Sequence, residues 1–366
     1  MGRRGEQQGR KQDRARSRRR LLAPCLLATL LLPALGGCFS AQYLWQAAAG
    51  ELDLLHRARP LELALQDRSL SRPLRALLAE VPRIKAFGET QGLKPTANYE
   101  AYADLQRPAA VWVVSACQPL AFTSKTWSFP IVGQVPYLGF FDEGEGHDYA
   151  RELRAQGLDV DERGSGAFST LGWFHDPILS TMVSPGEGAL GDLAEVVLHE
   201  SVHATVFLPG EVDLNERLAD FIASKLTPLY LQETRGPDSE EARAWEASEA
   251  WARARRARMH EAYLALAELY ASGASTPEKV ERKGTLLEAL RRELRTSRSI
   301  NNATLAQFRT YHRPLPELDA LFEACGRSVT RLLGAVQRLR SGSPVPPELE
   351  RMSREGCPVS RARTAR

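Results

Sequence analysis

Two helix-forming segments joined by a short break constrain the fold of this 366-residue chain more than any other feature. Apolar residues recur at helical spacing over about residues 191–207, and Gly191-Asp192 provides an acceptable start for that helix. A Leu-Pro-Gly sequence at residues 208–210 then interrupts the pattern, and a second helix opens near Asn215. Because Pro-Gly favours a chain reversal, we expect the second helix to fold back over the first.

The first of these helices contains the pattern His-Glu-x-x-His, formed by His199, Glu200 and His203. Histidines four positions apart lie on one helix face, so their imidazoles can bind one divalent metal ion. Glu200 can then take a proton from a water molecule at the metal. These residues predict one zinc ion per chain, with His199 and His203 as ligands and Glu200 as the catalytic base. The ligand types favour zinc without excluding other divalent ions.

A catalytic zinc ion needs a third protein ligand. Glu216 and Asp220 lie four positions apart on the second helix, and we predict that Glu216 completes the site. Asp220, one turn further along, is suited to hold the second nitrogen of a ligating imidazole. The sequence also offers rival third ligands: Asp213 in the turn, and His175 or Asp176, whose context is more typical of a loop or of the lining of a substrate cleft.

The N-terminal segment 1–37 has the pattern of an export signal. Nine of the 48 basic residues lie in the first twenty positions, and the stretch Leu21–Gly37 carries no charge. Its end, Leu35-Gly36-Gly37-Cys38, resembles the lipobox of bacterial lipoproteins, which implies acylation of Cys38 and tethering to a membrane. We therefore expect a signal peptide over 1–37 and a location at the bacterial cell envelope, facing the periplasm or the exterior. The segment 17–22 resembles a twin-arginine signal, so the export route stays open.

Charge and cysteine content exclude other classes of protein. Beyond residue 20 the chain has 39 basic and 43 acidic residues and no basic stripe, which gives no electrostatic footprint for nucleic acid. After loss of the signal and acylation of Cys38, three cysteines remain in an oxidising compartment. They allow one disulfide and one free thiol, with the pairing open among Cys117, Cys325 and Cys357.

The remaining patterns predict a mostly helical α+β fold with a small mixed sheet before the active-site helix. Strand patterns gather within about residues 108–183, beginning with the apolar run 109–114. Helical patterns dominate residues 40–87 and the segment after 238, where the expected helices span about 238–272, 277–297 and 316–340. We expect one domain over 38–340, with its active-site helices at about 191–232, followed by a disordered tail at 341–366.

The second metal segment resembles that of the zincin metallopeptidases with a glutamate ligand. Asn215, Glu216 and Asp220 are similar to the NExxxD of thermolysin-like enzymes, although the interval after the first motif is shorter here. A closer resemblance, to the bacterial family of putative aminopeptidases, which are predicted zinc lipoproteins, covers nearly the whole mature chain. It is carried by residues 37–43, 127–133, 135–142 and 169–177 together with both metal segments. The resemblance implies a zincin-like zinc peptidase, and more weakly an aminopeptidase.

Such a peptidase hydrolyses peptides with metal-activated water and must stabilise the oxyanion that forms. Tyr311 and Tyr137 are candidate donors, and the extended stretch 167–174 is a candidate edge strand for binding the substrate backbone. An aminopeptidase also needs an anionic group for the substrate's α-ammonium, for which the candidates are Asp142, Glu143 and Asp176. A lipid-anchored endopeptidase and a non-catalytic metal-containing binding protein remain alternatives. Glu200 argues against the last, because a purely structural site has no use for an unligated carboxylate.

Overall fold

The computed structural model describes residues 38–129, 133–167, 175–209, 211–312, 315–339 and 345–357. The chain divides into two compact units, Met1–Glu51 and Leu52–Arg366. In the first unit the described residues form most of helix α2 (Cys38–Arg57), and the expected signal peptide lies outside the described part of the chain. Among the described helices, none combines the length and the apolarity needed to cross a bilayer.

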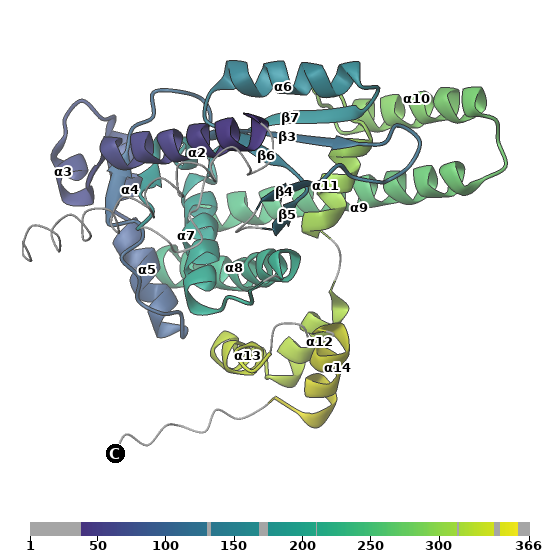
Figure 1. The fold of residues 1–366 in the computed structure, drawn as a ribbon. Helices are drawn as coiled ribbons and strands as arrows, with labels where there is room; N and C mark the ends of the chain where they lie inside the picture. Colours follow the sequence, from purple (N-terminus) through teal and green to yellow (C-terminus); the bar gives the residue numbers. More distant parts are fainter. Residues whose placement is uncertain are drawn as a thin grey trace, which may run out of the picture. The chain divides into compact units, whose positions relative to one another are not determined.

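The second unit is a mostly helical α+β fold, as the sequence predicts, but its strands form three small sheets instead of one. Strand β3 (Val111–Cys117) is buried along its whole length and pairs antiparallel with β6 (Leu138–Phe140) and β7 (Asp159–Ser165). Helix α6 (Glu143–Ala155) packs on this sheet (Figure 1). Helices pack against β3 and its side chains are buried along the whole strand, which explains why its sequence is a continuous apolar run.

The other two sheets are shorter. Strand β2 (Ala101–Ala103) pairs antiparallel with β1 (Ala58–Pro60) and parallel with β8 (Ile178–Leu179), so this sheet is the mixed one. Strands β4 (Trp127–Phe129) and β5 (Gly133–Val135) form an antiparallel pair of their own. The segment between β1 and β2 carries three helices: α3 (Leu61–Gln66), α4 (Arg72–Leu78) and α5 (Val81–Thr90).

Helices α7 (Ala189–Thr205) and α8 (Val212–Arg235) pack against each other at the centre of this unit, as the helix–break–helix pattern predicts (Figure 1). Helices α5 and α9 (Glu240–Ala271) also pack on α7. The α9 contact requires a glycine, since a Cβ added at Gly191 would lie 2.4 Å from Trp245 Cδ1. Helices α10 (Thr276–Glu293) and α11 (Asn302–His312) follow; α11 has no counterpart among the predicted helices.

A buried ionic cluster fixes α8 relative to α5. Glu80, at the start of α5, accepts a 2.8 Å hydrogen bond from the Tyr230 hydroxyl and pairs with Arg235 at 3.0 Å and Arg83 at 2.9 Å. Burial alone would raise the pKa of Glu80, but the hydrogen bonds from Tyr230 and Arg235 outweigh it, so the pKa is lowered. The native protein therefore holds this carboxylate in its ionised form.

We expect the stabilisation from Glu80 to depend on pH. Because folding lowers its pKa, this contribution is full above the ordinary value of about 4.5 and declines as the pH falls through the native pKa. Glu80→Gln should therefore lower the free energy of unfolding at pH 7, and its difference from wild type should shrink in acid. Urea unfolding from pH 7 to pH 3, with the exposed Glu89→Gln as the control, measures this. A difference that is independent of pH would contradict the assignment.

The C-terminal region differs from the sequence prediction in two ways. The prediction of one continuous helix over 316–340 is wrong, because two helices form there, α12 (Pro316–Ala324) and α13 (Val329–Val336). Gly326 and Arg327 separate them, with positive φ angles of 65° and 56°. The prediction of a disordered tail is also wrong for the described residues, since residues 345–355 form helix α14, in which Leu349 and Met352 are buried. Apolar contacts with the main core make this polar-looking segment helical.

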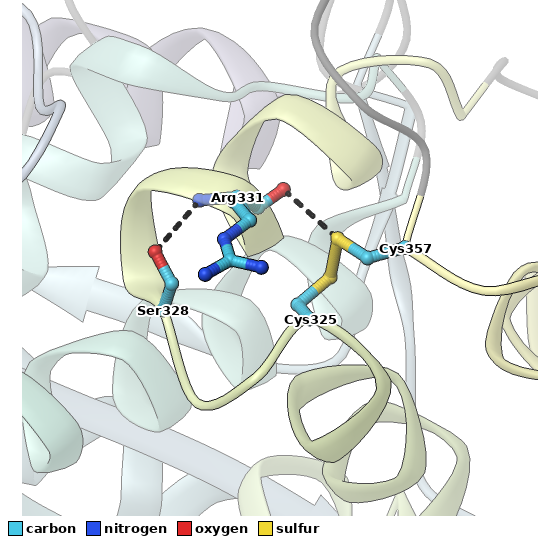
Figure 2. Close-up of a disulfide and its surroundings, with 4 residues drawn as sticks. All are labelled: Cys325, Ser328, Arg331 and Cys357. Atoms are coloured by element: carbon cyan, nitrogen blue, oxygen red, sulfur yellow. Dashed lines mark hydrogen bonds between the residues drawn. A yellow bond between two sulfur atoms is a disulfide. The ribbon is translucent and has the colours of Figure 1, made fainter.

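A disulfide closes this region (Figure 2). Cys325, directly after α12, is bonded to Cys357, two residues beyond the end of α14, and the two are 32 positions apart. Ser328 caps α13 beside the disulfide, where its hydroxyl accepts a 3.4 Å hydrogen bond from the Arg331 amide. Cys117 is a buried free thiol. The expectation of one disulfide and one free cysteine is confirmed, and the structure supplies the pairing.

We expect Cys357→Ser to lower the free energy of unfolding by about 2–4 kcal/mol, because the disulfide restricts a loop of this length in the unfolded chain. Denaturant unfolding with and without a thiol reductant measures the effect. Reductant should destabilise the wild type to the level of the variant and leave the variant unchanged. Wild-type protein whose stability does not respond to complete reduction would contradict this role.

Candidate metal centre

The two histidines of the motif lie on α7 away from its buried face. Leu198 and Val202, which directly precede the two histidines and therefore point about 100° away from them around the helix, are fully buried in the main core. His199 and His203 are four residues apart and therefore share a face, with their rings 4.8 Å apart between centroids. The apolar face thus orients the imidazoles toward α8.

Asn215 holds the turn between α7 and α8 closed. It is 3% exposed, its Oδ1 accepts a 2.9 Å hydrogen bond from the Leu208 amide, and its Nδ2 donates a 2.8 Å hydrogen bond to the Leu208 carbonyl. This reciprocal pair satisfies the backbone groups of Leu208 within the chain reversal. The next residue, Glu216, is thereby placed opposite the histidines.

Three ligand atoms converge at this point. The Nε2 atoms of His199 and His203 are 3.1 Å apart, and the Glu216 carboxylate oxygens lie 3.6 Å from the first and 3.5 Å from the second. Within the described part of the chain, this is the set of three His, Cys, Asp or Glu side chains able to hold a metal ion. The structure therefore brings together the two histidines and the Glu216 that the sequence predicts.

The donor set suits a tetrahedral ion. Two atoms that each lie about 2.0–2.1 Å from one zinc ion at a tetrahedral angle are about 3.4 Å apart. The 3.1 Å between the two Nε2 atoms lies close to that value, and one oxygen of the Glu216 carboxylate lies 3.6 Å from His199 while the other lies 3.5 Å from His203. Two imidazoles and one carboxylate also match the composition of catalytic zinc sites that keep one position open.

Asp220 fixes the orientation of His199. Its Oδ1 lies 2.9 Å from His199 Nδ1, which places the proton on that nitrogen and leaves the Nε2 lone pair for a metal ion. Burial lowers the pKa of His199, but the hydrogen bonds with Asp220 and Glu216 outweigh it and raise the pKa to about 10. The groups around His199 thus favour positive charge at this position, whether it is a proton or a metal ion.

His203 has a different environment. Burial and the charge of His199 lower its pKa. Its Nδ1 atom is buried and has no hydrogen-bond partner among the described residues. The ring is therefore held by packing on α7, with its Nε2 directed at His199 and Glu216.

An acidic side chain that the sequence reading missed lies one helical turn before His199. The pKa of Glu195 is raised to about 7, first by burial and then by the charges of Glu249 and Asp220. Glu249 belongs to α9, so only the tertiary structure brings it to α7. A proton on Glu195 reduces the repulsion among the carboxylates beside the metal centre.

The rival third ligands are not part of the cluster as far as the structure describes them. His175 is exposed, and Asp176 is buried with its amide donating a 3.3 Å hydrogen bond to Asn98 Oδ1. The side chain of Asp213 is not among those described. Glu216 is the ligand that the geometry supports.

Other candidates from the sequence lie elsewhere or beyond the description. Tyr137 packs against the apolar cluster around β3, which contains no residue of α7 or α8. Asp142 caps α6 by accepting a 2.9 Å hydrogen bond from the Glu145 amide, and Glu143 lies in the first turn of that helix. The side chain of Tyr311 and most of the stretch 167–174 lie outside the described residues.

Comparison with known proteins identifies the family to which this chain belongs. The family model described as putative aminopeptidase matches residues 42–347, a range that includes α7 and α8. The chain belongs to this family, and membership supports a peptidase-like hydrolytic function. Searches of curated proteins and of solved structures found no match.

We expect Asp220→Asn to weaken zinc binding by about 10–100-fold, because it removes the charge that holds His199 in the ligating orientation. Competition between the protein and a chromophoric chelator measures the affinity. The exposed Glu233→Gln, further along α8, provides the matched control and should bind zinc like the wild type. Equal affinity of all three proteins would show that Asp220 does not orient the ligand.

Proposed function

We propose that this protein is a zinc-dependent peptidase, specifically an aminopeptidase, of the cell envelope. The observation that carries the proposal is the convergence of His199, His203 and Glu216 beside Glu200, in a chain of the aminopeptidase family. The donor set of two imidazoles and one carboxylate supports zinc as the ion.

The proposed chemistry assigns separate tasks to the side chains. His199, His203 and Glu216 hold the ion, and Asp220 maintains the tautomer of His199. When bound, zinc lowers the pKa of a water molecule and polarises the substrate carbonyl. Glu200 accepts the proton of the attacking water and returns it to the leaving amine.

The position of Glu200 agrees with this task. It follows His199 directly on α7 and is only partly exposed. Its charge helps to raise the pKa of His199, so the carboxylate is close to the ligand cluster although it is not one of the three ligands. A carboxylate beside the metal ligands is what separates a hydrolytic site from a structural one.

We expect Glu200→Gln to retain zinc and to lower kcat by about 10²–10⁴-fold, since it removes the general base and leaves the ligands intact. The measurement is digestion of a mixed peptide library by the full-length protein in detergent, read by mass spectrometry. Chelator treatment should abolish cleavage and added zinc should restore it.

The products of that digestion decide between the alternatives. Loss of single N-terminal residues establishes an aminopeptidase, and internal cuts establish an endopeptidase. Wild-type protein that holds stoichiometric zinc and cleaves no peptide would overturn the peptidase proposal in favour of a metal-containing binding protein.

The envelope location is part of the same proposal. It is supported by the lipobox-like sequence ending at Cys38 and by the disulfide between Cys325 and Cys357, a bond typical of exported proteins. Cys38→Ser should move the protein from the membrane fraction to the soluble fraction of the cell. Membrane association that is unchanged in this variant would contradict anchoring through Cys38.

A further inference from the structure

Helix α2 presents large apolar side chains to the solvent. Leu44, Trp45 and Leu52 are 46%, 78% and 65% exposed, and they are three of the nine exposed large apolar side chains among the described residues. Trp45 is the most exposed of the nine. Single exposed apolar residues are ordinary, whereas several of them on one helix mark an interaction surface.

The exposed apolar residues share one side of α2. Trp45 and Leu52 are seven residues apart, which is close to two full turns, and Leu44 lies next to them around the helix. The alanines at positions 48–49 lie between them and are also exposed. Leu54 follows Trp45 by nine positions, which is half a turn around the helix, and is 2% exposed in the apolar cluster around β3. The apolar side of α2 is therefore opposite its buried side.

The exposed side of α2 can enter an apolar environment without an unpaired charge. Residues 38–50 contain no charged residue. Of the charges that follow, Asp53 and Arg57 pair with each other at 2.8 Å. An uncharged helix side with an exposed tryptophan suits the interface of a lipid bilayer, where the amphipathic ring of tryptophan lies at the level of the headgroups.

The chain itself supplies the membrane at this position. Helix α2 begins at Cys38, the residue that the lipobox-like sequence marks for acylation. Positions 38, 45 and 52 follow one another at intervals of seven residues and so fall on one side of the helix. Seven helical residues rise by only about 10 Å. Acyl chains attached at Cys38 thus bring the bilayer surface to Trp45, with no flexible linker between the anchor and the helix.

We propose that the exposed apolar side of α2 lies in the interface of the phospholipid bilayer to which Cys38 is anchored, with the helix axis along the membrane surface. This inference rests on the proposed lipid anchoring and adds a second contact with the same membrane. Leu44, Trp45 and Leu52 lie among the headgroups and the first part of the acyl chains. The acyl chains keep the protein on the membrane, and the helix prevents α2 from turning freely about its anchor.

The test measures quenching of tryptophan fluorescence by lipid. The acylated protein, produced from the full chain, is reconstituted into vesicles of phosphatidylethanolamine and phosphatidylglycerol, with or without bromine atoms on the acyl chains next to the headgroup. Trp45→Phe is compared with Trp251→Phe, because Trp251 is 62% exposed but lies on α9 with Arg255 over its ring. Mass spectrometry of the N-terminal peptide establishes acylation of Cys38, and circular dichroism establishes that each variant folds.

We expect brominated lipid to quench only Trp45. The chain contains six tryptophans, so wild-type emission should fall by up to about one sixth, since only a side chain at the level of the headgroups meets the bromine atoms. Trp45→Phe should lose this decrease and Trp251→Phe should keep it. The double variant Leu44→Glu and Leu52→Glu should stay in the vesicle fraction through its acyl chains, with the decrease reduced at least about twofold.

Four outcomes would overturn the inference. The first is acylated wild-type protein with equal emission in both kinds of vesicle, and the second is Trp45→Phe protein that is quenched as strongly as wild type. The third is Trp45 that is shielded from aqueous acrylamide but not quenched by brominated lipid, because a second copy or another protein then covers this side. The fourth is an N-terminal peptide without acyl groups, which would overturn the proposed anchoring and this inference with it. Since the peptide mass is measured separately, the two failures are distinguishable.

Discussion

The packing of α7 against α8 is the constraint on which the candidate site depends. Two imidazoles on one helix and a carboxylate on another must reach one point, and their separations of 3.1, 3.5 and 3.6 Å allow little relative movement of the helices. Asn215 closes the turn between the helices, and the Glu80 cluster holds the far end of α8 against α5. The ligands are therefore positioned by regular elements with buried faces, which is how precise sites are usually built.

Charge around the site is arranged for a cation. Glu200, Glu216 and Asp220 all act to raise the pKa of His199, so the cluster is most stable when positive charge is present. A divalent ion would meet that requirement better than a proton. The Nε2 atoms of His199 and His203 lie 3.1 Å apart, and each could then form a coordinate bond to the ion. Glu195, with its pKa near 7, limits the repulsion among these carboxylates.

Sequence patterns predicted best the elements whose burial is regular. The apolar run of β3 and the helical faces of α7 and α8 follow directly from residue spacing. Helix α11 was missed because its start is held by distant groups: the Asn302 amide donates to Asp159 Oδ2 at 2.9 Å. The tail was misjudged for the same reason, since its polar composition conceals three buried side chains, Val345, Leu349 and Met352, and a disulfide whose partner is 32 residues away.

By itself, the sequence identified the candidate metal ligands on α7. Helix geometry makes His199, Glu200 and His203 neighbours once the segment is helical, so the residue types and their spacing were sufficient. Only the tertiary structure decided that Glu216 faces both histidines and that Cys325 pairs with Cys357. The reason is physical: periodicity specifies which residues share a face, whereas contacts between separate segments depend on how those faces pack.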